Sequence, residues 1–177
     1  MDCNPELIAA AQNNTDKLGF SDRFALHTGE LADTRFLENL RMEASPVQLV
    51  MANPPWRLVG SGRLPATEAR RKALFGDKGT FPLFASAASS LLEEDGRFAC
   101  IISPDRLQDM LAALDGAGLT PYLLQYIHKQ KTSPATFVLI EARKGAHAKP
   151  SVAEPIALYA PERFFTLESL AFCPFLR

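Results

Sequence analysis

The residues of this sequence best suited to chemistry are the consecutive Asn53, Pro54, Pro55 and Trp56. They follow the apolar run Val47–Ala52, which predicts a buried strand that ends where they begin. Ligands of open α/β sheets collect at the carboxyl ends of strands. An asparagine followed by two prolines and an aromatic ring therefore predicts a rigid pocket for a flat group that carries an amine.

The exocyclic amine of an aromatic base, such as N6 of adenine, is a weak nucleophile because its lone pair is delocalised into the ring. The Asn53 side-chain oxygen and a neighbouring backbone carbonyl can each accept one N–H bond, which favours the positive charge that develops on nitrogen. The prolines fix φ and add no N–H donor, and Trp56 offers a face for base stacking. The alternative is a plain strand-to-loop stop with a surface tryptophan, but the preceding buried strand favours a catalytic interpretation.

Two acidic positions are candidates for binding a nucleotide-like cofactor. Asp2 and Cys3 precede a predicted helix, where nucleotide-binding sheets hold ribose hydroxyls. An acid at that place is also favoured by the helix dipole alone. Glu30, after Gly29 and a predicted strand, can bind the amino group of a cofactor adenine, or can belong to a solvated turn.

A basic segment follows the Asn-Pro-Pro-Trp residues. It carries a charge of +4 in a chain whose net charge is −1, with only Glu68 and Asp77 as acids. The cations are Arg57, Arg63, Arg70, Arg71, Lys72 and Lys78. We expect Arg63, Arg70, Arg71 and Lys72 to contact RNA phosphates, although a solvated helix face is an equally simple interpretation of any one of them.

Composition sets the class of the protein. The chain has 177 residues, of which 47% are hydrophobic and 22% charged, which is typical of a globular domain. Three cysteines, widely spaced and without a CxxC pair, argue against a zinc site or a disulfide framework and favour a cytoplasmic location. No apolar stretch reaches the roughly 20 residues of a membrane span, so neither a membrane nor a metal is expected, and the oligomeric state is not indicated.

Strands that alternate with helices predict an α/β, doubly wound sheet, mostly parallel with an antiparallel C-terminal strand pair. We expect a domain over residues 1–145 and a proline-rich tail over 146–177 packed on it. The predicted helices are 5–17, 33–41, 81–94 and 103–114, with a short helix between 57 and 78, and the predicted strands are 23–27, 47–52, 97–102, 122–128 and 136–142.

Together, Asp-x-Asn-Pro at the start, Gly-Glu at 29–30 and Asn-Pro-Pro-Trp at 53–56 resemble class I S-adenosylmethionine-dependent methyltransferases. The Asn-Pro-Pro-aromatic form resembles the branch that methylates amino groups. With the Arg-rich segment, residues 103–107 and residues 138–145, nearly the whole chain is similar to the bacterial tRNA(Val) adenine-N6 methyltransferase group.

The resemblance implies a Rossmann-like fold, S-adenosylmethionine as cofactor and tRNA as substrate and partner. It implies that Asp2 binds the cofactor ribose, with Cys3 beside it and Glu30 near the adenine. Asn53 and the Pro54 carbonyl would hold the target amine next to the cofactor, Pro55 would stiffen the loop, and Trp56 would stack on the base. Here tryptophan replaces the commoner tyrosine or phenylalanine, and glutamate replaces the usual aspartate at position 30.

One departure concerns the start of the chain. In the family the glycine-rich cofactor turn lies about 20 residues before the ribose-binding acid, whereas Asp2 has one residue ahead of it. We therefore expect a truncated form that lacks the first strand and that turn, leaves strand edges unpaired and binds cofactor weakly. The alternatives are methylation of another planar amine (guanine N2 in rRNA or a protein glutamine) and an inactive RNA-binding remnant.

Overall fold

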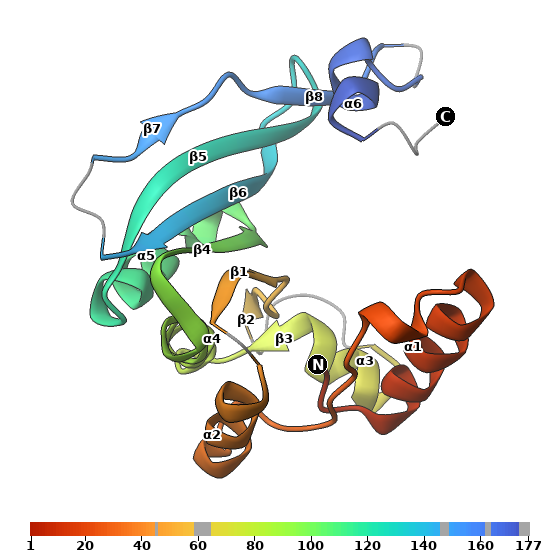
Figure 1. The fold of residues 1–177 in the computed structure, drawn as a ribbon. Coiled ribbons are helices and arrows are strands. Elements are labelled where there is room, and N and C mark those ends of the chain that lie inside the picture. Colours follow the sequence, from red (N-terminus) through yellow and green to blue (C-terminus); the bar gives the residue numbers. More distant parts are fainter. Residues whose placement is uncertain (45, 59–64, 146–148, 162–163, 174–177) are drawn as a thin grey trace. The chain divides into compact units, whose positions relative to one another are not determined.

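The computed structural model describes residues 1–44, 46–58, 65–145, 149–161 and 164–173. Two compact units divide the chain (Figure 1), one over residues 1–45 and the other over residues 46–177. The first unit holds the candidate cofactor residues Asp2, Cys3 and Glu30, and the second holds the Asn-Pro-Pro-Trp residues.

The N-terminal unit contains helices α1 (Pro5–Leu18) and α2 (Thr34–Glu43) and the 3-10 turn η1 (Ser21–Arg23). The α1 helix begins where the Asn4 side chain accepts the Glu6 N–H, and it ends at Gly19, whose φ of 70° is favourable only for glycine. The predicted helix over residues 5–17 is therefore confirmed. The predicted helix over 33–41 is confirmed as α2, which begins after Asp33 as its N-cap and ends at Glu43.

The strand predicted over residues 23–27 is wrong. Arg23 closes a 3-10 turn, residues 24–27 belong to no strand, and an isolated parallel bridge joins Asp2 to Thr28, the residue after the predicted strand. Phe24 is 57% exposed, so this stretch lacks the buried face of a core strand. A short apolar run does not form a strand where no neighbouring strand among the described residues completes its backbone hydrogen bonds.

The C-terminal unit contains a six-stranded mixed sheet in which β1 pairs β4, β4 pairs β6, β6 pairs β5, and β5 also pairs β7 and β8. Its strands are β1 (Val47–Ala52), β4 (Leu92–Ile102), β5 (Leu119–Gln130), β6 (Ala135–Lys144), β7 (Ser151–Val152) and β8 (Ile156–Tyr159). The β1–β4, β5–β7 and β5–β8 pairs are parallel, and β4–β6 and β5–β6 are antiparallel. The predicted antiparallel pair near the C-terminus is thus confirmed as β5 and β6.

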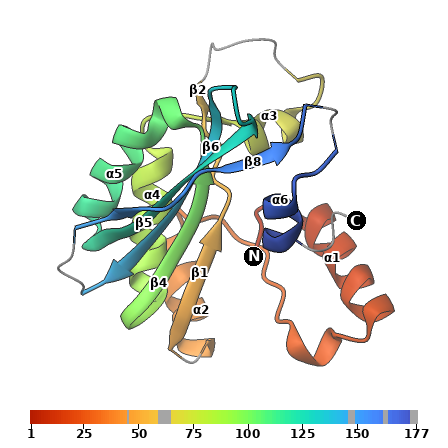
Figure 2. The same cartoon turned by 90° about the horizontal axis from the view of Figure 1, so that it is seen from above.

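Two helices, α4 (Thr80–Leu91) and α5 (Leu107–Gly116), pack side by side on one face of this sheet, as Figures 1 and 2 show. A 3-10 turn, η2 (Pro104–Arg106), leads into α5, so the predicted helix over 103–114 is confirmed with an irregular start. The core between the helices and the sheet includes Phe81, Ala85, Phe98, Ile102, Met110, Leu114, Val138 and Ile140, all buried.

Smaller elements complete the C-terminal unit. Strands β2 (Arg57–Leu58) and β3 (Phe75–Gly76) pair in parallel, and α3 (Glu68–Leu74) between them confirms the expected short helix. Helix α6 (Leu167–Phe172) lies beside β8, where the Ser169 hydroxyl donates to the Leu158 carbonyl at 3.1 Å. The segment predicted as a tail therefore adds two strands and a helix. No helix in the described ranges is both long enough and apolar enough to cross a membrane.

The helix predicted over residues 81–94 ends earlier than expected. Helix α4 stops at Leu91 because Leu92 enters β4 opposite Val47, and the pairing shifts before Leu49 meets Arg97. Asp95 takes a left-handed φ of 62° within this irregularity. The Lys144 ammonium donates to the Ser89 and Leu92 carbonyls at 2.8 and 2.7 Å and so completes the helix end from the sheet.

Candidate active site at the end of strand β1

Asn53 is the first residue beyond β1, and its place follows from the sheet. Strand β1 runs parallel to β4, with Ala52 opposite Cys100, so Asn53 lies at the carboxyl end of a parallel pair. Asn53 is exposed, and its side-chain amide makes no hydrogen bond within the described residues. A free amide at a strand end is available to a ligand, whereas an amide in the core would have been bonded internally.

The two prolines hold the chain in one path. Pro54 is fully buried. The Pro55 carbonyl oxygen lies so close to β3 that a Cβ atom on Gly76 would be only 2.5 Å from it. Because this approach leaves no room for a side chain, Gly76 is the residue that permits β3 to pack against the Asn-Pro-Pro-Trp residues.

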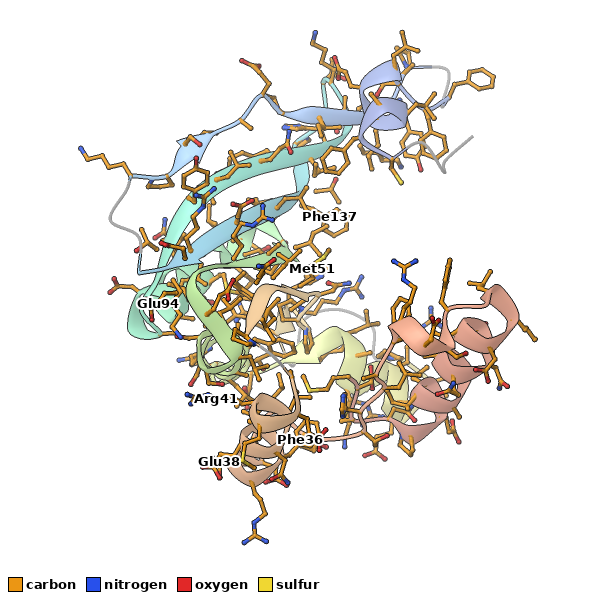
Figure 3. All side chains as sticks on the ribbon, in the orientation of Figure 1. Phe36, Glu38, Arg41, Met51, Glu94 and Phe137 are labelled. Atoms are coloured by element: carbon orange, nitrogen blue, oxygen red, sulfur yellow. The ribbon has the colours of Figure 1, made fainter. Side chains whose placement is uncertain are left out.

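Trp56 is partly buried and packs against the core. Its ring meets Phe137 of β6 edge-on, with centroids 6.1 Å apart and planes at 76°. The Arg57 guanidinium carbon lies 5.3 Å from the indole centroid, within the range of a cation–π contact. Figure 3 labels Phe137 on β6 and Met51, an exposed residue of β1.

Arg106, at the start of α5, binds the Trp56 carbonyl. Its Nη1 donates to that oxygen at 2.9 Å, although the two residues are 50 positions apart in sequence. Residues 53–56 form a corner of the chain, and the backbone carbonyls of this corner make different contacts. The Trp56 oxygen is bonded and the Pro55 oxygen packs against Gly76, while the Pro54 oxygen has no hydrogen-bond partner among the described residues.

In the N-terminal unit, backbone pairing brings Asp2 beside residues 27–29. The Asp2 N–H donates to the His27 carbonyl at 3.2 Å, and the Gly29 N–H donates to the Asp2 carbonyl at 3.1 Å. Glu30 follows directly and is exposed, as is Cys3. The three cofactor candidates of this unit thus lie at one place in it, whereas Asn53, the fourth, belongs to the other unit.

Gly29 is required by the packing of this unit, because a Cβ atom there would lie 2.4 Å from the Phe36 ring of α2, labelled in Figure 3. One Asp2 carboxylate oxygen accepts the Asn4 N–H at 2.8 Å. The other carboxylate oxygen has no partner within the described part of the chain and can accept a ribose hydroxyl. The residues present therefore fit the ribose end of a nucleoside cofactor.

Three of the basic residues lie on α3. Arg70, Arg71 and Lys72 are exposed, and none of them forms an ion pair with another described residue. Thr67 caps the helix by accepting the Arg70 N–H at 3.4 Å. Helix α3 carries these three cations against one acid, Glu68, so its net charge of +2 makes a positive surface for phosphate contacts. Arg63 lies outside the described residues.

A cavity of about 620 Å³ lies elsewhere, between α4 and α5. It is lined by Leu58, Lys78, Pro82, Ser86, Asp109, Ala112, Ala113, Gly116 and Ala117. None of the Asn-Pro-Pro-Trp residues contributes to it. Across the described ranges, no cluster of three or more His, Cys, Asp or Glu side chains is arranged to hold a metal ion.

Three residues that shape the corner, Gly76, Arg106 and Phe137, were not predicted as site residues. Arg106 was expected in a helix start and belongs to the family-like stretch 103–107, and Phe137 was expected in a strand. Each of these contacts joins segments far apart in the chain, so no local pattern indicates it. Gly76 is the partial exception, because a glycine beside an aromatic residue in a strand suggests a close backbone approach.

Comparison with known proteins adds to this geometry. No protein-family model and no curated protein matches the sequence. Among solved structures, a predicted O-methyltransferase from Agrobacterium tumefaciens superposes with a TM-score of 0.69 at 20% identity, over 98% of this chain and 73% of that one. The chain has a Rossmann-like methyltransferase fold.

Two further structures share parts of this methyltransferase fold. A protein assigned as an rRNA methylase from Clostridium thermocellum gives a TM-score of 0.50 at 20% identity, over 80% of this chain and 72% of that one. A modification subunit assigned to a type I restriction enzyme of Vibrio vulnificus gives 0.53 at 12% identity, over 98% of this chain and 39% of that one. At these identities the shared property is the fold.

Proposed function

We propose that this protein transfers a methyl group from S-adenosylmethionine to the N6 amine of an adenine in tRNA. The observation that carries the proposal is the exposed and free Asn53 amide at the end of β1. The neighbouring Pro54 is buried and its carbonyl has no hydrogen-bond partner in the described residues, so this carbonyl must become accessible when the substrate binds. An amine with two N–H bonds needs two such acceptors. The methyltransferase fold supplies the reaction class by analogy.

The chemistry assigned to these residues is electrostatic. When Asn53 Oδ1 and the Pro54 carbonyl each accept an N–H bond, they favour the positive charge that develops on nitrogen as it attacks the methyl group. Loss of one such prearranged hydrogen bond lowers turnover by about 100- to 1,000-fold in enzymes that stabilise charge in this way. The nitrogen becomes acidic once it is alkylated, so its proton leaves to water without a dedicated base.

Trp56 would hold the base by stacking. The Arg57 guanidinium covers one face of the indole, and a base stacked on that face must displace it. An exposed cation–π contact is worth about 0.5–1 kcal/mol, whereas stacking a base on an aromatic ring is worth about 1–3 kcal/mol. Displacement is therefore favourable, and it releases the Arg57 cation for a neighbouring phosphate.

Cofactor binding is assigned to Asp2, Cys3 and Glu30 of the N-terminal unit, while Asn53, in the C-terminal unit, is assigned chiefly to the target amine. The free carboxylate oxygen of Asp2 would accept ribose hydroxyl protons, and the exposed Glu30 carboxylate would accept the N–H of the cofactor adenine. Bound S-adenosylmethionine supplies a methyl group on a positively charged sulfur. The tRNA substrate is assigned from the cations of α3, since Arg70, Arg71 and Lys72 are exposed and without ion-pair partners in the described residues.

Because weak cofactor binding is expected of this chain, the test uses the 177-residue chain with methyl-labelled S-adenosylmethionine at a concentration that saturates a weak site. Total tRNA, ribosomal RNA and a protein fraction are offered separately, and the RNA products are digested to nucleosides. We expect label in N6-methyladenosine from tRNA, and at least a 100-fold loss with Asn53→Ala. Label only in methylguanosine from ribosomal RNA, only in protein, or in no fraction would refute the proposal.

A further inference from the structure

Arg106 is a buried cation that joins three segments of the C-terminal unit. Its side chain is 4% exposed. Nε contacts Asp109 Oδ2 at 2.7 Å, Nη1 donates to the Trp56 carbonyl at 2.9 Å, and the guanidinium carbon lies 4.5 Å from the Phe81 ring centroid. The residue therefore ties the corner after β1 to the starts of α4 and α5.

A guanidinium in such a place requires compensation. Burial of an unpaired charge is strongly unfavourable, and here the charge is balanced by the Asp109 carboxylate and the face of Phe81. Asp109 is 61% exposed, so the ion pair reaches solvent at its acidic end. The contacts of Arg106 with Asp109 and Phe81 do not involve Trp56. The hydrogen bond to the Trp56 carbonyl is therefore the contact through which Arg106 holds the corner.

The backbone torsions show why that bond is placed at Trp56. The proline rings fix φ of Pro54 and Pro55, and a following proline restricts ψ of Asn53 and Pro54. The prolines do not restrict the backbone beyond Pro55, so Trp56 is the first residue of the corner whose φ and ψ are both free. The Gly76 approach limits the peptide before it, and Arg106 fixes the peptide after it.

We propose that Arg106 is a positioning residue for the amine site. By holding the Trp56 carbonyl it directs the indole toward the base and keeps the Pro54 carbonyl aimed at the amine, and this role rests on the proposed function. Arg106 itself does not touch the substrate. Its replacement should therefore lower turnover more than it weakens substrate binding.

The first test needs no substrate, because Trp56 is the only tryptophan in the chain and its fluorescence reports on this corner alone. Arg106→Met should shift the emission maximum and increase quenching by acrylamide, since the indole loses its fixed orientation. The emission and quenching of Arg106→Lys should lie between those of the wild type and those of Arg106→Met. An ammonium can donate a hydrogen bond to the Trp56 carbonyl but cannot at the same time bridge that carbonyl to Asp109. Free guanidinium at non-denaturing concentration should restore the emission of Arg106→Ala.

Arg143→Met is the matched control. Arg143 also combines an aromatic face, Tyr122 at 3.7 Å, with a carboxylate, Glu141 at 3.4 Å, but it has no contact with the corner. We expect its Trp56 emission to equal that of the wild type. If Arg106→Met has wild-type emission and quenching while remaining folded, the positioning role is refuted, whether or not the protein transfers methyl groups.

The second test is kinetic. A displacement of about 1 Å at a reacting group can lower the rate about 100-fold. We expect kcat of Arg106→Met to fall by about 10- to 100-fold with KM for RNA nearly unchanged. If Arg106→Met has the wild-type kcat and a raised KM for RNA, the positioning role of Arg106 is wrong while the proposed function stands. A wild-type chain without transfer would refute the proposed function, while the fluorescence test would still decide whether Arg106 orients Trp56.

Discussion

Replacement of Gly76 by alanine should move the proposed amine site at residues 53–56 without substituting any of its residues. The added Cβ would lie 2.5 Å from the Pro55 carbonyl oxygen and 2.7 Å from Thr80 Oγ1. Ordinary contact begins at 3.4 Å, so the Pro55 peptide must retreat by about 0.9 Å. The Thr80 hydroxyl cannot yield freely, because it accepts the Asp77 N–H at 2.9 Å.

The magnitude follows from that displacement. Overpacking at a closely packed position lowers the free energy of unfolding by about 1–3 kcal/mol. A shift of about 1 Å at the adjoining amine site lowers the transfer rate by up to about 100-fold. Urea denaturation gives the first quantity, methyl transfer to tRNA gives the second, and Trp56 emission reports directly on the displaced corner.

Gly116→Ala is the matched control. Gly116 is the last residue of α5, and a Cβ atom there meets nothing within 4 Å. That substitution should raise the free energy of unfolding by about 0.4–1 kcal/mol, because it restricts the unfolded chain. If Gly76→Ala unfolds at the wild-type urea concentration with wild-type Trp56 emission, the close approach of β3 to the corner does not exist as described.

Three other predictions follow from the same structure. Asn53→Ala should lower kcat by about 100- to 1,000-fold with cofactor affinity nearly unchanged, and calorimetry that showed weaker cofactor binding would contradict this. Replacing Arg70, Arg71 and Lys72 with glutamine should weaken RNA binding and reduce the salt slope by about 0.7 per lost phosphate contact; an unchanged slope would exclude α3 from the RNA surface. Burial raises the pKa of the Cys100 thiol from 9.0 to about 12. The folded state therefore keeps a proton that the unfolded chain loses, and the free energy of unfolding should fall by about 1.4 kcal/mol per pH unit above pH 9. That slope should be absent in Cys100→Ala.

Local sequence signals predicted the elements whose ends are fixed locally. Helix α1 lies between an asparagine cap and a glycine with positive φ, both within a residue of the helix, so its bounds could be predicted. The position of Asn53 was predictable for a similar reason, because a six-residue apolar run ends immediately before it. Asn53 is exposed in the structure.

The errors occurred where distant segments decide the outcome. Residues 92–94 have helical character, but Leu92 pairs with Val47 of β1, so these residues form the start of strand β4. The stretch after Arg23 has strand character, but among the described residues it has no neighbouring strand, and the one bridge nearby joins Asp2 to Thr28. Arg106 reaches Trp56 across 50 residues. In each case a partner elsewhere in the chain, or the lack of one, outweighs the local preference.

The far side of β5 has a consequence for assembly. Its twelve-residue edge is covered by β7 at Leu123–Leu124 and by β8 from Ile127 onward, so the side facing outward consists of strands of only two and four residues. Pro155, which precedes β8, has no N–H to offer. An additional chain that approached this side would find two short, interrupted templates and not a continuous ladder. This boundary of the sheet is therefore blunted against growth by strand addition.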